Sequence, residues 1–243
     1  MVSGLILASG YGVRLKKHIN MPKYFVDVKG KPLIYYPITS LYRGGVRDIY
    51  IIVNNEIYRR LELIRDILDM YSINIIVNPY PELDNGYTLL YGLERICGDY
   101  VLVSVSDHIY PPIVVKNLLD RIRSGGDFYI AGDPDPIYID VIEATKIRVG
   151  RDNRVLKVGK DLSIYDYIDM GVFLFSRGIF RYLDVGRESM SISNLINKVI
   201  SGGGEGYVVP FEGIEWKDVD TIDDLKFVRS RLFGEVLKKF FEV

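Results

Sequence analysis

The 243-residue chain carries 31 Lys and Arg residues against 32 Asp and Glu residues, so its formal net charge is −1. This balance gives no electrostatic argument for a nucleic-acid partner, which usually requires a strongly basic face. A single cysteine excludes an intramolecular disulfide and a multi-cysteine metal site. No apolar run approaches the ~20 residues that cross a bilayer, so we expect a cytoplasmic protein that does not span a membrane. The absence of glutamine beside 26% charged residues is a tendency of thermophile proteins.

The first half of the chain alternates apolar runs with helical patterns. Such alternation implies right-handed crossovers and a largely parallel sheet. In chain order we expect a strand at Val2–Ala8, a helix at Pro32–Tyr42, a strand at Asp48–Val53, a helix at Glu56–Met70, a strand at Ile73–Val77, a helix at Tyr87–Ile96, a strand at Tyr100–Val105 and a helix at Pro111–Arg123.

The second half is richer in short strands joined by Asp, Pro and Gly turns. The whole pattern predicts an α/β fold, namely a Rossmann-like, mostly parallel sheet flanked by helices, with a small mixed β lobe. We expect strands at Asp127–Gly132, Lys146–Val149, Val155–Val158, Met170–Phe175 and Tyr207–Pro210, and helices at Ile192–Ile200 and Ile222–Phe241.

A glycine loop, ASGYGVRL at residues 8–15, directly follows the first predicted strand. Gly10 and Gly12 let the backbone approach phosphates, and successive N–H groups can form an anion-binding nest. The segment lacks both the Gly-Lys-Ser/Thr ending of a Walker A loop and the dinucleotide fingerprint. Arg14 and Lys23 add two cations, so we interpret the loop as a phosphate site, with a purely structural turn as the alternative.

A carboxylate, Asp107, stands at the end of the strand at Tyr100–Val105. Ligands of parallel sheets bind at the carboxyl ends of the strands. A carboxylate there is positioned to hold Mg²⁺, which prefers oxygen ligands and substrate phosphates. A turn or helix cap before Pro111 is the alternative, and we interpret His108 as a packing or hydrogen-bonding residue.

Further carboxylates precede the last predicted helix, in WKDVDT at residues 216–221. Thr221 or Asp220 could cap this helix, whereas Asp218 is not needed as a cap. Asp107 and Asp218, at two separate strand ends, would give a phosphate-bound Mg²⁺ its protein anchor. Asp220 is the second choice for this role.

Taken in order, these motifs resemble those of the sugar-phosphate nucleotidyltransferase family. The family signature Leu-Ala-Ala-Gly-x-Gly-x-Arg-Leu, then Pro-Lys and Gly-Lys-Pro-Leu, appears here as LILASGYGVRL, MPKYF and GKPLI. The later Gly-Asp-His/Gly and Trp-x-Asp-Val-x-Thr elements appear as SDH and WKDVDT. Three positions depart from the pattern: Ser9 and Ser106 replace small residues, and Tyr24 replaces a proline. The resemblance covers essentially the whole chain.

Within the family, DNGYTLL, IDVIEATKIRV, LKVGKDL and IDMGVFLF resemble the CTP:inositol-1-phosphate cytidylyltransferases of archaea and thermophiles. The sugar enzymes have Glu-Lys-Pro where this chain has Gly159-Lys160-Asp161. The resemblance implies Mg²⁺-dependent transfer of CMP from CTP to inositol 1-phosphate, for synthesis of inositol phosphodiester solutes or lipids. It also implies a free-standing enzyme whose product passes to a membrane-bound transferase.

The resemblance implies one domain over residues 1–243, with a nucleotide-binding half at about 1–125, an acceptor-binding lobe at about 126–210 and a closing metal-site segment at 211–243. The implied catalytic residues are Arg14, Lys23, Asp107 and Lys160. The implied nucleotide contacts are Ala8, Ser9, Gly10, Gly12, Asn85 and Gly86. The acceptor candidates are Asp140, Glu143, Thr145, Lys146 and Asp169, although Asp140 and Glu143 could instead simply flank a strand. The metal candidates are Asp107, Asp218 and Asp220.

Two other functions remain open at this stage. A hexose-1-phosphate or phosphocholine-type nucleotidyltransferase would use the same phosphate chemistry with a different acceptor pocket. A non-catalytic nucleotide-binding regulatory protein is disfavoured, because a binding-only site could dispense with the metal pair Asp107 and Asp218. A dehydrogenase is disfavoured because no dinucleotide fingerprint follows the first strand.

Overall fold

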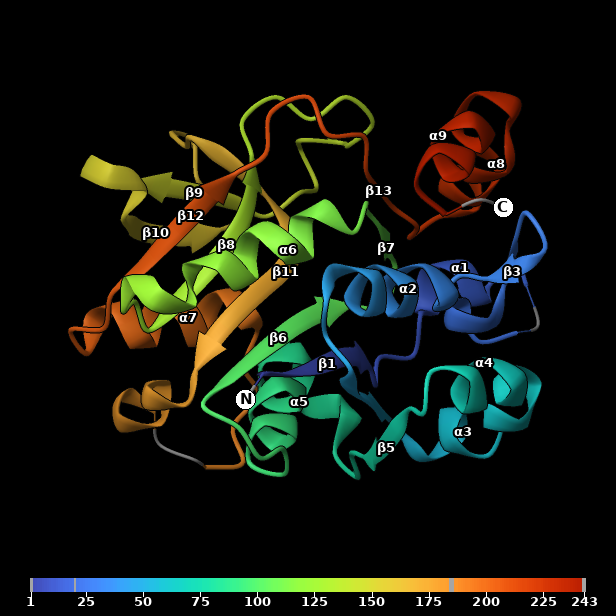
Figure 1. Cartoon of the computed structure of the whole chain (residues 1–243), viewed down its shortest axis with the longest axis horizontal. Coiled ribbons are helices and arrows are strands. Elements are labelled where there is room, and N and C mark those ends of the chain that lie inside the picture. Colours follow the sequence, from blue (N-terminus) through green and yellow to red (C-terminus); the bar gives the residue numbers. More distant parts are fainter. Residues whose placement is uncertain (1, 20, 184–185, 242–243) are drawn as a thin grey trace.

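The structure, a computed structural model, describes residues 2–19, 21–183 and 186–241. A twisted central sheet runs through the molecule with helices on both faces (Figure 1). Within the described residues this sheet has nine strands. They are β1 (Val2–Ala8), β4 (Asp48–Val53), β5 (Asn74–Val77), β6 (Tyr100–Val105), β8 (Phe128–Asp133), β9 (Lys146–Val149), β10 (Val155–Gly159), β11 (Tyr167–Ser176) and β12 (Gly206–Pro210).

The sheet has a parallel half and a mixed half. β1 pairs in parallel with β4 and β6, and β4 pairs in parallel with β5. The long strand β11 runs antiparallel to β6, β8 and β9, while β12 is parallel to β8. The order β10-β9-β11-β6-β1-β4-β5 confirms the expected Rossmann-like sheet with an added mixed lobe.

The helices fill the crossovers of the parallel half and close the chain. They are α1 (Val13–Lys16), α2 (Tyr35–Gly44), α3 (Asn55–Tyr58), α4 (Arg65–Met70), α5 (Asp84–Leu93), α6 (Ile113–Leu119), α7 (Ile192–Ser201), α8 (Ile222–Arg229) and α9 (Arg231–Phe241). Two small ribbons join β2 (Asp27–Val28) to β3 (Lys31–Pro32) and β13 (Lys217–Asp218) to β7 (His108–Ile109). None of the described helices is both long and apolar enough to span a bilayer.

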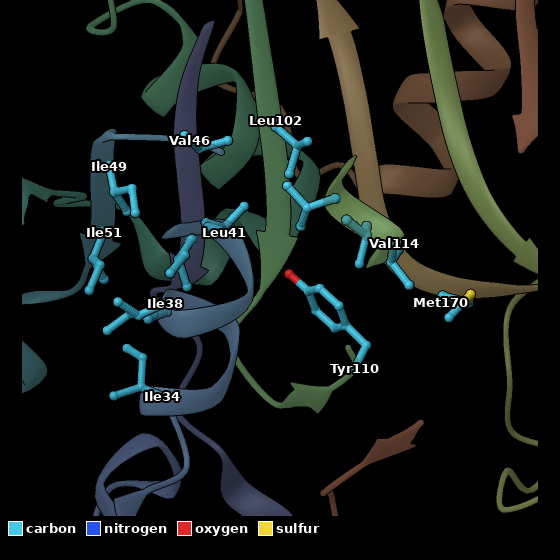
Figure 2. Packing of buried hydrophobic residues seen from close by; sticks show 14 of the residues in the cluster. Ile34, Ile38, Leu41, Val46, Ile49, Ile51, Leu102, Tyr110, Val114 and Met170 are labelled. Carbon is cyan, nitrogen blue, oxygen red and sulfur yellow. The ribbon is translucent and has the colours of Figure 1, made fainter. Parts of the chain in front are cut away.

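Alternate residues of β1 enter two cores because successive side chains of a strand point to opposite faces. Leu5 and Leu7 pack in the core that contains residues of α5 and α7. Ile6 and Ala8 pack in the core that contains residues of α2 and α6. Figure 2 shows side chains of α2 in this second core, beside those of the neighbouring strands. β1 is therefore buried on both of its faces, in the middle of the parallel half.

Two helices that the sequence predicts as continuous are interrupted in the structure. The single closing helix expected at Ile222–Phe241 is two helices, because Ser230 between α8 and α9 has an extended backbone (φ −62°, ψ 166°). This break lets Phe227 and Phe233 both pack on Tyr138, with ring centroids at 5.2 and 5.8 Å. The α8–α9 hairpin covers the N-terminal segment beside α2 and β3 (Figure 1).

The helix expected at Glu56–Met70 is also interrupted. It consists of α3, a 3₁₀ turn at Leu61–Ile64 and α4. At Ile64 the backbone leaves the α region (φ −129°, ψ 20°), yet Ile57, Leu61, Ile64 and Leu68 are all buried in one core. The apolar residues at helical spacing are thus buried by tertiary packing, although the helices that carry them are short. The other expected elements differ from the observed ones mainly at their ends.

Candidate active site

The glycine loop after β1 is packed against the segment that carries Lys23. Gly12 has φ +58°, a conformation that favours glycine. A Cβ at Gly12 would lie 2.9 Å from Cβ of Lys23, which is closer than real Cβ atoms come. The Tyr24 hydroxyl donates to the Gly10 carbonyl oxygen at 2.7 Å. The tyrosine that departs from the family pattern therefore holds the loop in place.

The two serine departures also form hydrogen bonds close to the loop, one with a side chain and one with backbone. The Ser9 hydroxyl oxygen lies 3.2 Å from Nδ2 of Asn78, which donates to it. The Ser106 hydroxyl donates to the Leu7 carbonyl oxygen at 2.6 Å. Both serines are buried, so each departure supplies a hydrogen bond that an alanine or glycine would lack.

Lys23 joins three motifs that are far apart in the sequence. Its side chain is only 6% exposed, and its ammonium lies 2.6 Å from Oδ2 of Asp107. The same ammonium donates to Asp220, which also pairs with Arg14 at 2.7 Å. The glycine loop, the end of β6 and the segment before α8 thus meet at one point.

The charges at this point stabilise one another. Burial alone would lower the pKa of Lys23, but the carboxylates of Asp107 and Asp220 outweigh burial and raise it. Burial likewise acts to raise the pKa of Asp107, yet the Lys23 ammonium holds that pKa below its usual range. Both groups are therefore charged at neutral pH.

Asp218 reaches the site through the β7–β13 ribbon. Its backbone pairs with His108, directly after Asp107 in sequence, and its carboxylate bonds to the Lys217 ammonium at 2.8 Å. His108 is held in turn, since its Nδ1 donates to the Met170 carbonyl oxygen at 2.8 Å. The ribbon therefore fixes the spacing between the carboxylates that come from β6 and from the closing segment.

The donor set fits a phosphate-bound Mg²⁺. Asp107, Asp218 and Asp220 all line one cavity, and their side chains are between 24% and 29% exposed. Among the residues that the structure describes, no group of three or more His, Cys, Asp or Glu side chains is placed to hold a metal by itself. Mg²⁺ commonly completes its octahedron with water and substrate phosphates, so a small carboxylate set is sufficient.

The cavity, of about 570 Å³, extends from these carboxylates into the mixed lobe. A connected hollow of about 330 Å³ shares Arg14, Asn85, Asp107 and Asp220 with it, and is also lined by Gly10, Gly12 and Lys23. The predicted site residues that line the larger cavity are Arg14, Asn85, Asp107, Glu143, Thr145, Lys160, Asp169, Asp218 and Asp220. The two hollows together extend from the glycine loop to the mixed lobe.

Asp169 lies in the wall of the cavity where β11 bulges. Its Oδ1 accepts from the backbone N–H of Gly171 at 2.8 Å. Gly171 has φ +70°, and a Cβ there would lie 2.5 Å from Val105 and 2.6 Å from Nδ1 of His108. Burial raises the pKa of the Asp169 carboxyl to about 6.

Two acceptor candidates lie outside the cavity lining. Asp140 is exposed and caps a turn, because its Oδ1 accepts from the Ile142 N–H at 3.0 Å. Lys146 is buried, and its ammonium donates to three backbone carbonyl oxygens, one of them Lys160 at 2.9 Å. Lys146 therefore holds the loop that carries Lys160. Asp140 and Lys146, which the sequence predicts to contact the acceptor, are thus not among the residues that line the cavity.

Three nucleotide candidates support the site through the backbone. Ala8 and Ser9 are buried at the end of β1. Gly86 donates its N–H to the Met190 carbonyl oxygen at 2.8 Å. A Cβ at Gly86 would lie 2.4 Å from the Ser191 carbonyl oxygen, so only glycine fits. None of the three lines either hollow.

Sequence reasoning missed several residues that line the cavity. Asp84 has φ +69°, unusual for a residue other than glycine, and strained backbone often marks functional positions. Ser193 and Asn194 lie in the first turn of α7, whose N-cap is Ser191. The capping pattern predicts a helix start but carries no information about what that start faces.

The fold and the site together define a nucleotidyltransferase. Residues 4–167 match the MobA-like NTP transferase domain, and the chain belongs to this family. Among the solved structures, the inositol-1-phosphate CTP transferase from T. maritima is similar, with a TM-score of 0.87 and 25% identity over 99% of this chain and 96% of that chain. A putative glucose-1-phosphate thymidylyltransferase from Bacillus anthracis shares the fold, with a TM-score of 0.77 and 18% identity over 94% of each chain.

Among curated proteins, the chain is similar to the bifunctional IPC transferase and DIPP synthase of Thermococcus kodakarensis. The identity is 31% over 96% of this chain and 51% of that protein. The protein of the same name from Rubrobacter xylanophilus is 32% identical over 96% of this chain and 52% of its own length. The chain thus spans about half the length of these curated relatives.

Proposed function

We propose that this chain transfers CMP from CTP to inositol 1-phosphate, with CDP-inositol and pyrophosphate as products. One observation carries the proposal: Asp107 and Asp220, which both bind the Lys23 ammonium, line the same cavity as the carboxylates of the mixed lobe. The similarity to an inositol-1-phosphate CTP transferase supports this choice of substrates. The two curated relatives named bifunctional IPC transferase and DIPP synthase, which the chain matches over about half of their length, support it further.

The nucleotide half neutralises the triphosphate. Gly10 and Gly12 line the hollow in which the phosphates would lie, and successive backbone N–H groups of such a loop can bind an anion. Arg14 and Lys23 supply two positive charges there, and both are anchored by Asp220. When the bond between the α-phosphorus and the β-bridging oxygen breaks, these cations stabilise the charge on the leaving pyrophosphate.

The mixed lobe orients the acceptor. Lys160 would pair with the acceptor phosphate, whose oxygen attacks the α-phosphorus in line with the leaving pyrophosphate. Glu143 and Asp169 would accept hydrogen bonds from ring hydroxyls, and Thr145 lies in the same wall. Positioning two anionic reactants accounts for most of the rate enhancement in such a reaction.

Asp107 and Asp218 are the residues that would hold Mg²⁺, with Asp220 beside them. Bound there, the ion supplies charge neutralisation at the phosphates. The acceptor phosphate monoester has a second pKa of about 6 and is ionised at neutral pH. Its attacking oxygen therefore carries no proton that a general base must remove.

Pyrophosphate release in the presence of Mg²⁺ tests this function. CTP, UTP, dTTP, ATP and GTP should each be combined with inositol 1-phosphate, glucose 1-phosphate and phosphocholine, at room temperature and at high temperature. We expect release with CTP and inositol 1-phosphate, abolished by EDTA. Release only with glucose 1-phosphate or phosphocholine would overturn the acceptor assignment. Nucleotide binding without release for any pair would favour the regulatory alternative.

The wider cellular setting is part of the same proposal. We expect the enzyme in the cytoplasm, with its product passing to a membrane-bound transferase that makes inositol phosphodiesters. Fractionation of cells that produce the tagged protein, followed by an assay of each fraction, tests this location. Activity confined to the extracellular fraction would contradict it.

A further inference from the structure

A second cavity, of about 270 Å³, lies beside α5 and is used by no step of the proposed reaction. Its polar and aromatic lining is Tyr80, Tyr87, Tyr91, Glu94, Arg95 and Arg187. Three tyrosines and two arginines around one small hollow combine flat rings with positive charge. This combination suits a ligand that has both a planar group and an anionic group.

The tyrosines form a continuous aromatic wall. The ring centroids of Tyr80 and Tyr87 are 6.1 Å apart, and those of Tyr87 and Tyr91 are also 6.1 Å apart. The first pair meets edge to face and the second pair is tilted. A flat heterocycle can stack on one of these rings, because every base has a π face.

The two arginines lie against the tyrosine rings and keep guanidinium N–H groups that could donate hydrogen bonds to a ligand. The Arg95 guanidinium lies 3.3 Å from the Tyr91 ring centroid, and its Nη1 donates to the Tyr91 carbonyl oxygen at 2.8 Å and to Glu94 at 3.3 Å. The Arg187 guanidinium lies 4.5 Å from the Tyr80 ring centroid. No hydrogen bond or ion pair joins Arg187 to another residue within the described part of the chain.

We propose that this cavity binds a nucleoside phosphate as an effector, with the base against the tyrosine wall and the phosphate between Arg95 and Arg187. Paired guanidinium N–H groups match phosphate oxygens, and stacked arginines lose little side-chain entropy on binding. The cavity has less than half the volume of the catalytic one. It suits a single nucleotide and not a nucleotide together with a second substrate.

The effector cavity and the catalytic cavity share the helix α5. Asp84 and Asn85 at its start line the catalytic cavity, whereas Tyr87 and Tyr91 line the effector cavity. A ligand that shifts the tyrosines would therefore move the first turn of the same rigid helix.

The two cavities also share the segment before α7. Arg187 lines the effector cavity, and Ser191 to Asn194 line the catalytic one. The segment is bonded to α5 by the Gly86 N–H to the Met190 carbonyl oxygen at 2.8 Å, and by the Ile192 N–H to Oδ1 of Asn85 at 3.0 Å.

A third connection runs to the glycine loop. Oδ1 of Asn78 accepts from the Tyr80 N–H at 2.9 Å, and Nδ2 of the same buried side chain donates to the Ser9 hydroxyl at 3.2 Å. Asn78 also donates to Thr88 of α5 at 3.0 Å. Direct hydrogen bonds thus join the segment of Tyr80 to the glycine loop, and coupling between the two sites would be reciprocal.

Binding stoichiometry tests the effector site. Isothermal titration with CMP, CDP, AMP and ADP should give two sites per chain for at least one of these probes. The double substitution Arg95→Ala and Arg187→Ala should weaken one site by at least ~10-fold, the scale of losing hydrogen bonds to a charged group. Arg59→Ala, an exposed arginine that lines neither cavity, is the matched control and should keep both sites.

A single site for every probe, or a second site that survives the double substitution with equal affinity, would overturn the proposal. The charge-preserving pair Arg95→Lys and Arg187→Lys guards against a folding defect, and should bind between wild type and the alanine variant. Melting temperatures of all variants should match that of Arg59→Ala.

Kinetics test the coupling between the cavities. A probe that occupies the effector site should change the KM of the catalytic nucleotide by ~5- to 150-fold, the usual range of allosteric coupling. The double alanine variant should keep the basal KM and retain only the change in KM that arises from competition by the probe at the catalytic site. An unchanged KM in wild type would refute the coupling. The binding test does not depend on the proposed reaction, so failure of CMP transfer and failure of the effector site are distinguishable.

Discussion

The ammonium of Lys23 lies 2.6 Å from Oδ2 of Asp107, although the two residues are 84 positions apart in the sequence. Lys23 lies in the segment that packs against the glycine loop after β1, and Asp107 follows β6, so the pair connects the ends of two neighbouring parallel strands. The carboxylate that would anchor Mg²⁺ therefore also holds the lysine that would meet the nucleotide phosphates. The cationic site is organised before a substrate arrives, which lowers the cost of reorganisation during the reaction.

Substitution Lys23→Ala should cut turnover by at least ~100-fold, the scale of losing one preorganised charge contact. The lysine is buried and is bonded to both Asp107 and Asp220, so its loss leaves the Asp107 carboxylate without its ammonium partner. Steady-state pyrophosphate release measures the effect. Lys17→Ala, an exposed lysine close in sequence, should stay near wild type. Near-wild-type turnover of Lys23→Ala would remove this residue from the mechanism.

Substitutions of the three carboxylates should differ in how they change the dependence of activity on Mg²⁺ concentration. Asp107→Asn and Asp218→Asn should each lower turnover by at least ~100-fold and raise the Mg²⁺ concentration needed for half activity. Asp220→Asn should instead raise the KM of the nucleotide, because Arg14 and Lys23 lose their shared anchor. A raised Mg²⁺ requirement in Asp220→Asn, with none in Asp218→Asn, would exchange the two roles.

Tyr24→Phe removes only the hydroxyl that donates to Gly10. We expect a loss of about 1 kcal/mol in the free energy of unfolding, typical of one hydrogen bond, together with a higher KM for the nucleotide. Chemical denaturation and steady-state kinetics measure the two effects. Tyr58→Phe, at an exposed tyrosine, is the control. Unchanged nucleotide KM in Tyr24→Phe would mean that the loop does not need this contact.

Asp169 predicts a pH dependence of stability. Burial raises the pKa of its carboxyl to about 6 in the folded protein, whereas an unfolded chain has an ordinary value near 3.9. Between about pH 4 and 6 the folded state binds more protons at this group, so its contribution to stability falls as pH rises. Above pH 6 the contribution is constant and unfavourable.

Unfolding of wild type and Asp169→Asn at several pH values measures this effect. The free energy of wild type relative to the variant should decrease from pH 4 to pH 6 and then level off. A difference that is independent of pH would show that the carboxyl titrates normally. The same variant should raise the KM of the acceptor if Asp169 accepts its hydrogen bonds.

Gly171→Ala should destabilise the protein more than Gly203→Ala. Both glycines have positive φ, +70° and +93°, so both substitutions carry roughly 1–2 kcal/mol of backbone strain. Only at Gly171 would the new methyl group also meet Val105 and His108, at 2.5 and 2.6 Å. Overpacking adds about 1–3 kcal/mol. Equal losses in denaturation would mean that β11 shifts to accept the methyl group.

Much of the fold could be predicted because its signals are local. The strands β1, β4, β6 and β9 have the expected ends, since each is a continuous apolar or alternating run between turn residues. Lys23 and Asp107 could be predicted to lie near one another because loops at the carboxyl ends of parallel strands share one edge of the sheet.

Contacts between distant segments decided the rest. The sequence offered Asp140 and Glu143 as equal acceptor candidates, but only Glu143 lines the cavity, because the Asp140 side chain is turned onto the Ile142 N–H. Spacing alone likewise could not reveal that Tyr24 holds Gly10.

The sequence by itself determined the class of fold, the glycine loop and the charged residues of the catalytic cavity. Only the tertiary structure decided which carboxylate meets Lys23, where the closing helix breaks, and that tyrosines and arginines gather beside α5. The physical reason is the range of the interactions. Periodicity and strand ends are set by neighbours along the chain, whereas the direction of a loop side chain is set by whichever distant group satisfies its charge or hydrogen bond.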